Sequence, residues 1–159
     1  MHVEAKLAEL GLQLPEPMRL PEGVRPLWRQ VTVIGTRAVI AGHGPRQLDG
    51  TPPAGGKVGA DVTPEAGYQA ARSTALGVLA DLKEAIGDLD RVVAWVRVFG
   101  LVNSAPGFVG QARVIDGFTE LMVSLYGDEI AICPRAVAGA AELPFGSPVI
   151  IESEVELAS

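Results

Sequence analysis

The chain has 159 residues, of which 48% are hydrophobic and 20% are charged. This composition is typical of one globular domain with a sizeable core, and it excludes disorder as the general state of the chain. The formal net charge is -6, and the 13 lysines and arginines are scattered singly along the sequence. Since no run of basic residues can neutralise phosphates, we expect no nucleic-acid partner.

Cysteine usage and hydropathy limit the compartment. The single cysteine, Cys133, excludes an intrachain disulfide and a cysteine-based metal cluster, which fits a reducing environment. The N-terminus has no basic region followed by an apolar run, and the strongest apolar segment, 92–102, is interrupted by Arg97. We therefore expect a soluble cytoplasmic protein that does not contact a membrane.

The first third of the chain is predicted to hold a short helix, an arm and a hairpin. Helix-forming residues run over 4–10 and stop at Gly11, and four prolines between positions 15 and 26 keep the next segment extended. Two strand-like runs, 29–34 and 37–41, are separated by two residues, which suits an antiparallel hairpin. Residues 42–59, rich in glycine and proline, are predicted to form a long functional or interface loop.

The clearest helix is predicted over residues 64–86. Thr63 is a good N-cap residue, Pro64 suits the first helical position, and Gly87 ends the helix. Apolar residues recur at steps of three and four and form one stripe, which should lie on a sheet. The stripe consists of Tyr68, Ala71, Ala75, Val78, Leu79, Leu82 and Ile86.

Three more elements follow. Residues 91–102 are apolar at both parities, which predicts a central strand covered on both faces. Asn103 and Ser104 can cap a second amphipathic helix, which ends at Gly127. In the last strand, 149–157, apolar and acidic residues alternate, with Ile150 as the exception on the acidic face. The apolar face should pack under the helices, and the acidic face should look toward solvent or another subunit.

The order of these elements favours an α+β sandwich of one sheet and two helices. We expect a single domain over residues 1–159, with an N-terminal helix and arm at 1–27 and a core at 28–157. One face of such a sheet is uncovered, and identical sheets from neighbouring subunits are a natural cover for it. We therefore expect an oligomer.

Arg135 is the first residue to consider as a ligand-binding group. It follows Cys133 and Pro134 at the start of a strand of small, apolar residues. A guanidinium keeps its charge at any working pH and can hold a carboxylate through two N–H donors, so a small carboxylate is the ligand to expect. The alternative is a structural arginine paired with one of the 19 acidic residues.

Several segments make the chain resemble the RidA (YjgF) family of enamine and imine deaminases, over roughly residues 28–157. Segment 35–45, GTRAVIAGHGP, is similar to the family's early strand ending in Ser-Gly-Gln-x-Pro. The spacing from Pro-Arg at 134–135 to Leu-Pro at 143–144 is also the family's, and segments 63–89 and 114–117 match weaker landmarks. The resemblance implies a chorismate-mutase-like fold with a mixed sheet, assembled as a homotrimer with ligand sites between subunits.

The resemblance also implies a pocket. Arg135 matches the arginine that binds the substrate carboxylate, and Gly42 matches the glycine whose backbone lines that pocket, with Ala41 and Val137 beside these two. Trp28 falls where the family usually has a tyrosine against the ligand, so aromatic packing is kept and the hydroxyl is lost. The alternative for Trp28 is a plain core or interface aromatic.

Three positions depart from the family's pattern. Asp116 falls where an asparagine is common, and its charge would oppose an anionic substrate, so a helix-surface role is the alternative. Ile150 also lines the implied pocket but aligns with the family's glutamate, which helps to position or activate the hydrolytic water, and Glu152 lies about 7 Å farther along the strand. His43, often a glutamine in the family, is a hypothetical replacement base. The alternative is a turn histidine bonded to the backbone.

The function implied by the resemblance is hydrolytic deamination of 2-enamino and 2-imino acids to 2-keto acids and ammonia, with Arg135 and His43 as catalytic candidates and no metal or organic cofactor. A second possibility is a non-catalytic trimer that binds a small carboxylate, or a specialised pathway enzyme that reuses the pocket; Ile150, Trp28 and Asp116 favour it. The third is the endoribonuclease role attached to some relatives, against which the net charge and the lack of a basic, aromatic groove argue.

Overall fold

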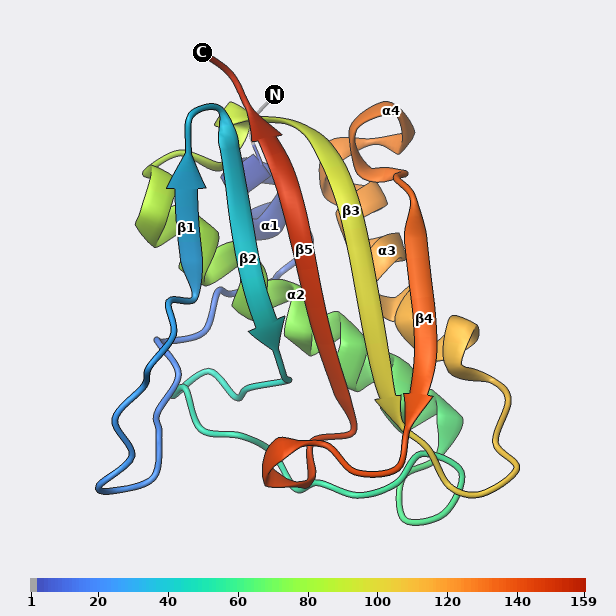
Figure 1. Cartoon of the computed structure of the whole chain (residues 1–159). Coiled ribbons are helices and arrows are strands. Elements are labelled where there is room, and N and C mark those ends of the chain that lie inside the picture. Colours follow the sequence, from blue (N-terminus) through green and yellow to red (C-terminus); the bar gives the residue numbers. More distant parts are fainter. Residues whose placement is uncertain (1–2) are drawn as a thin grey trace.

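The computed structural model describes residues 3–159, so residues 1–2 of the expected arm lie outside the described part. A five-stranded sheet in the order β1-β2-β5-β3-β4 has helices packed on one face (Figure 1). The strands are β1 (Val31–Ile34), β2 (Arg37–His43), β3 (Val92–Asn103), β4 (Arg135–Ala140) and β5 (Val149–Leu157). The helices are α1 (Val3–Glu9), α2 (Pro64–Ile86), α3 (Gln111–Tyr126) and α4 (Asp128–Ala131), with short 3-10 turns η1 (Leu89–Arg91) and η2 (Pro144–Gly146). The predicted α+β sandwich is confirmed.

The order of the strands explains why both long helices lie on the same face. β3 and β4 are parallel, whereas β5 is antiparallel to both β2 and β3 and lies between them. β2, β3 and β4 therefore run in one direction, and the crossovers through α2 and α3 both move the same way across the sheet. Crossovers of the same hand place their helices on the same face, which leaves the other face of the sheet uncovered.

Capping residues determine both ends of α2. The side chain of Thr63 accepts a hydrogen bond from the Ala66 N–H at 3.1 Å, and Gly87, with φ of 82°, donates its N–H to the Lys83 carbonyl. The predicted apolar stripe is buried except for Tyr68, and it packs on the sheet and on α3. No helix within residues 3–159 is long and apolar enough to cross a membrane.

The start of the second helix differs from the prediction. Asn103 is the last residue of β3, and its buried side chain accepts a hydrogen bond from Lys57 at 3.1 Å. Ser104 donates to the Val102 carbonyl, and α3 begins only at Gln111, after Gly110, which makes no side-chain cap. The expected cap at 103–104 is therefore wrong, because the strand continues through Asn103 and uses the polar groups in its own termination.

Close approaches between layers require glycine at two positions. A Cβ at Gly100 of β3 would lie 2.7 Å from Cγ1 of Ile115 on α3, and a Cβ at Gly117 would collide with the Tyr68 carbonyl of α2. Trp95 of β3 packs on α3, with its ring 5.6 Å from that of Phe118 in an edge-to-face arrangement. These contacts bring α3 against both the sheet and α2, which fixes the place of its polar face.

A buried polar cluster links the loop after β2 to α2. Asp81 of α2 is 5% exposed, and its Oδ2 accepts hydrogen bonds from Nε2 of His43 at 2.8 Å and from Arg46 at 2.6 Å. Arg46 also donates to the carbonyls of Gly77, at 2.6 Å, and Glu16, at 3.3 Å. One carboxylate thus holds β2, the long loop and the arm against the same helix.

The charge of Asp81 is stabilised by these partners. Burial alone would raise the pKa of its carboxyl, but the hydrogen bonds from His43 and Arg46 outweigh burial and hold the pKa below its usual value. Removing the carboxylate would leave two buried donors with no anionic partner, which is a costly arrangement in a protein interior.

Asp81→Asn is expected to lower the free energy of unfolding by about 3 kcal/mol or more near neutral pH. Because the folded pKa of Asp81 is lowered, its stabilising effect is complete above the unfolded-state pKa of about 4 and is lost as pH falls through the folded value. Urea unfolding at several pH values should therefore show the two proteins converging in acid. The matched control is Glu129→Gln, an exposed carboxylate of α4; an equal loss in both variants would contradict this role.

Candidate functional site

Arg135 lies at the start of β4, an edge strand of the sheet. It pairs with Val98, whose side chain is buried under the helices, so Arg135 projects toward the helix-covered side. There its guanidinium donates a hydrogen bond to Thr119 at 2.9 Å and forms an ion pair with Asp116 at 3.0 Å, both on α3. The side chain is 23% exposed, so the charge is held in a fixed place and is still open to a ligand.

Asp116 belongs to a chain of ionic contacts along α3. Arg113 lies 3.5 Å from Asp116 and 2.9 Å from Glu120, and its guanidinium stacks over the ring of Tyr68. Tyr68 donates to Glu120 at 2.6 Å. This bond and the one from Arg113 lower the pKa of the Glu120 carboxyl, while the pKa of Tyr68 is raised. The carboxylate of Asp116 therefore sits between two arginines.

Gly42 and Ile150 are brought together elsewhere. A Cβ at Gly42 would lie 2.8 Å from Cγ2 of Ile150, so the absence of a side chain at Gly42 is what lets the two strands approach here. Ile150 is half-buried and pairs with Leu101 on the uncovered face of the sheet. Ala41 lies next to Gly42, with its N–H bonded to the Gln30 carbonyl at 2.9 Å. Three predicted pocket residues are thus neighbours.

Within one chain these neighbours are far from Arg135. Arg135 pairs with Val98, Val98 with Ser153, and Ser153 with Ile40. Arg135 is therefore separated from Ile40 by the spacing of three neighbouring strand pairs, or about 14 Å, and Gly42 lies two residues farther along β2. A small carboxylate cannot touch Arg135 and Gly42 of the same chain.

The other two implied lining residues occupy different surroundings. Trp28 lies in the segment before β1 and is 46% exposed, beside Leu27, which is 84% exposed. Its ring is therefore available to a partner and is not part of the core. Val137 of β4 points to the same side as Arg135 and packs against the core cluster, so it supports the strand that carries Arg135.

His43 lies in the interior, with no exposed surface. Its Nε2 bonds to Asp81, and its Nδ1 bonds to the Ala41 carbonyl at 2.6 Å. Both ring nitrogens face oxygen partners in the interior, so neither is placed to accept a proton from a bound ligand. This geometry argues against the replacement-base hypothesis and supports a structural role in the cluster with Asp81.

Cys133 precedes Arg135 and is half-buried. Burial raises the pKa of its thiol, and the nearby Arg135 charge offsets only part of that effect. A thiol with a raised pKa is mostly protonated near neutral pH, so Cys133 is poorly suited to act as a nucleophile.

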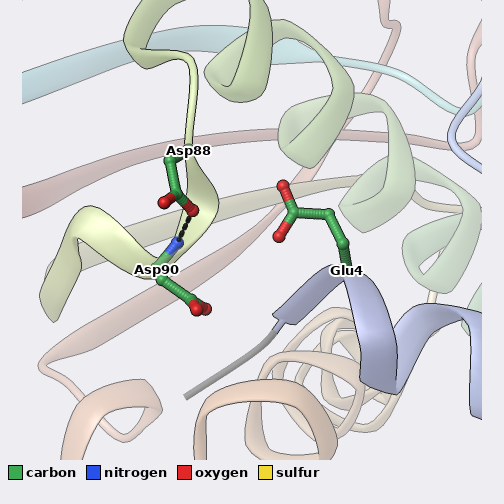
Figure 2. A group of neighbouring side chains, drawn as sticks. All are labelled: Glu4, Asp88 and Asp90. Atoms are coloured by element: carbon green, nitrogen blue, oxygen red, sulfur yellow. Dashed lines mark hydrogen bonds between the residues drawn. The ribbon is translucent and has the colours of Figure 1, made fainter.

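A group of three acidic side chains lies where α1 meets the end of α2. Oxygen atoms of Glu4, Asp88 and Asp90 all lie within 4.8 Å of one another (Figure 2). Asp88 accepts the N–H of Asp90 at 2.8 Å, Asp90 accepts the N–H of Val3 at 2.8 Å, and Glu4 pairs with Lys83 at 3.5 Å. Each carboxylate already has a protein partner, and together they dock α1.

A cavity of about 570 Å³ lies between the long loop and the first half of α2. It is lined by residues of the loop, such as Pro45 and Gln47, and of the helix, such as Ala66 and Gln69. None of the pocket residues that the family resemblance implies lines it. The cavity is therefore separate from the Arg135 position.

Sequence reasoning missed the partners of Arg135 and His43. Asp116 and Thr119 are three residues apart and so share a helix face, and Arg113 and Glu120 continue that face. This polar spacing was the available signal for the ionic chain along α3. Arg46 and Asp81 gave no such signal, since they lie 35 residues apart and meet only through the fold.

The chain is similar to known proteins over nearly its whole length. A model of the family described as "YjgF/chorismate mutase-like, putative endoribonuclease" matches residues 4–154. The protein TCP17 of Trypanosoma cruzi is 35% identical over 157 residues, covering 98% of this chain and 94% of that protein. The match thus extends over nearly the whole of both chains.

Solved structures are also similar to this chain over nearly its whole length. A protein of unknown function from Agrobacterium tumefaciens is 32% identical, with a TM-score of 0.84, over 98% of this chain and 91% of that one. A protein from Shewanella oneidensis, named as a "putative endoribonuclease", is 27% identical, with a TM-score of 0.88, over 99% and 100%. The chain therefore belongs to the YjgF (RidA) family and has its chorismate-mutase-like fold.

Proposed function

We propose that the protein hydrolyses small 2-imino acids, formed from 2-enamino acids, to 2-keto acids and ammonia. The observation that carries this proposal is the guanidinium of Arg135, which is held by Asp116 and Thr119 and is partly exposed. These two oxygens use only some of its N–H donors, so a ligand carboxylate can take the others. The resemblance to the RidA (YjgF) family of enamine and imine deaminases supports the reaction class.

The reaction needs little from the protein. Water adds across the C2=N bond of the imine, with its oxygen on C2 and one proton on nitrogen. The proton of the new hydroxyl group then moves to nitrogen, the C–N bond breaks, ammonia leaves, and a C2=O bond forms. No electron transfer takes place, so no oxidant or reductant is needed. Holding the carboxylate and aligning water with C2 supplies most of the effect, because a fixed reactant pays less entropy on reaching the transition state.

The separation of Arg135 from Gly42 favours a site made by two copies. About 14 Å lies between their strands in one chain, and they face different sides of the sheet. A neighbouring copy that covers the open face with its own edge strand would bring its Arg135 close to Gly42 and Ile150. We propose a ring of three copies, as the family resemblance implies.

The uncovered face has the composition of an interface. Val39, Phe99, Leu101 and Ile150 give it an apolar centre, and the exposed fraction of Val39 is 41%. Its charged residues are already paired, with Arg37 close to Glu154 and Glu156 at 3.5 Å and Arg97 at 3.4 Å from Glu152. Burying such a face removes apolar surface from water without leaving unpaired charges.

A second candidate function is binding of a small carboxylate without turnover. Ile150 favours it, because an isoleucine beside Gly42 cannot activate water. Glu152, the next residue on the same face, is directed to Arg97. Cleavage of RNA is not proposed, because the net charge is -6 and the open face carries three glutamates on β5.

Wild-type protein is expected to accelerate keto-acid release when it is coupled to a pyridoxal-dependent threonine dehydratase, with semicarbazide trapping the surviving imine. Arg135→Ala should lose at least about tenfold of this acceleration, because the carboxylate loses its charged partner. Arg135→Lys should recover part of it, and Arg19→Ala, an exposed arginine of the arm, should behave as wild type. Carboxylate binding without any acceleration would instead establish the second candidate.

The proposed assembly gives its own expectation. Sedimentation should show a particle of about three times 16.6 kDa. Leu101→Glu, in the apolar centre of the open face, should dissociate it, since the interface would then bury an unpaired charge. Leu10→Glu, at the end of α1 on the other side of the sheet, is the matched control and should stay assembled. A wild-type monomer at micromolar concentration would rule out a shared site.

A further inference from the structure

Asp116 places a negative charge directly beside the proposed carboxylate-binding group. Its Oδ1 lies 3.0 Å from the Arg135 guanidinium, and its side chain is 32% exposed, so the carboxylate is open to a ligand at the same point. A bound monoanion would approach Arg135 and Asp116 together. The attraction of the first would be offset by the repulsion of the second.

The neighbours of Asp116 keep its carboxylate at this place. Arg113, one turn earlier on α3, lies 3.5 Å from its Oδ2, and Glu120 takes the main ion pair of Arg113 at 2.9 Å. The two arginines and two carboxylates together are neutral. A ligand that matches this arrangement carries no net charge, with its negative group at Arg135 and a positive group at Asp116.

We propose that Asp116 makes the site selective for carboxylates that also carry a cationic nitrogen on C2, with the ligand nitrogen donating to Asp116 while Arg135 holds the carboxylate. This inference rests on the proposed function and names the form of the substrate, the protonated iminium. In a 2-imino acid the nitrogen is attached to the carbon next to the carboxyl carbon. Its two charged ends therefore lie as close together as the facing groups of Arg135 and Asp116.

Selection by charge also suits the reaction. The protonated C=N bond is the more electrophilic form, since nitrogen can accept the electron pair when water attacks C2. A carboxylate hydrogen-bonded to that nitrogen stabilises the cation. The product keto acid has lost the nitrogen and is a simple monoanion, which Asp116 repels. The same residue thus favours binding of substrate and departure of product.

The test compares two stable ligands with the same carbon skeleton, 2-aminobutanoate and 2-oxobutanoate, titrated by calorimetry at neutral pH. The first is a zwitterion and stands in for the iminium; the second is the monoanionic product. Wild-type protein should bind 2-aminobutanoate more tightly by roughly fivefold or more. Asp116→Asn keeps an oxygen for Arg135. It should weaken the binding of 2-aminobutanoate and strengthen that of 2-oxobutanoate, so that the ratio of the two affinities reverses.

Controls separate this role from a merely structural one. Glu129→Gln removes an exposed carboxylate of α4, outside the ionic chain along α3, and should leave the ratio unchanged. If Asp116→Asn changes the affinity for both ligands by the same factor, or changes neither affinity, charge selection is wrong although the proposed function stands. If wild-type protein binds neither ligand, the proposed function fails and this inference fails with it. The same holds if Arg135→Ala binds both ligands as tightly as wild-type protein does.

Discussion

The ion pair between Arg135 and Asp116 is the interaction on which the functional account depends. It joins the edge strand β4 to α3 and holds a guanidinium at 3.0 Å from a carboxylate where both remain partly exposed. A free arginine on a surface would sample many rotamers and would lose that freedom on binding a ligand. Here the freedom is already lost on folding, so the protein presents a preorganised pair of opposite charges.

The rest of the fold serves to place this pair. Glycines at 100 and 117 let α3 approach the sheet and α2, and this approach puts Thr119 and Asp116 next to β4. Toward the opposite edge of the sheet, Asp81 ties β2 and the long loop to α2 through buried hydrogen bonds. The two halves of the proposed site, at β4 and at β2, are thus built by separate anchors, and in the proposed assembly they meet between neighbouring copies.

Elements with strong local signals could be predicted from sequence. α2 has a threonine cap, a proline and a terminal glycine, and β5 alternates between its two faces with Ile150 as the exception, so the bounds of both elements follow from local sequence. The start of α3 could not be predicted in this way, because Asn103 can equally cap a helix or end a strand. Packing of β3 against β4 and β5 decided in favour of the strand.

In the site, too, some features have a local sequence signal and others depend on the fold. The two readings of Arg135, ligand group and structural ion pair, could not be separated by residue type. The structure shows that Arg135 is paired with Asp116 and still has donors to offer. His43 illustrates the opposite failure, since its position in a glycine-rich segment gave no sign that Asp81, 38 residues later, would enclose it. Contacts between distant segments depend on the fold and leave no local pattern.

Subunit mixing tests whether the site is shared by two copies. Arg135→Ala and Gly42→Val, whose side chain would collide with Ile150, are purified separately and together from cells that express both chains. Each variant alone should bind no 2-aminobutanoate. Random assembly from equal amounts of the two chains should restore about a quarter of the wild-type sites, because about half of the sites receive a native Arg135 and about half of those receive a native Gly42 from the next copy. Mixed rings that bind no more than either variant alone would contradict the account.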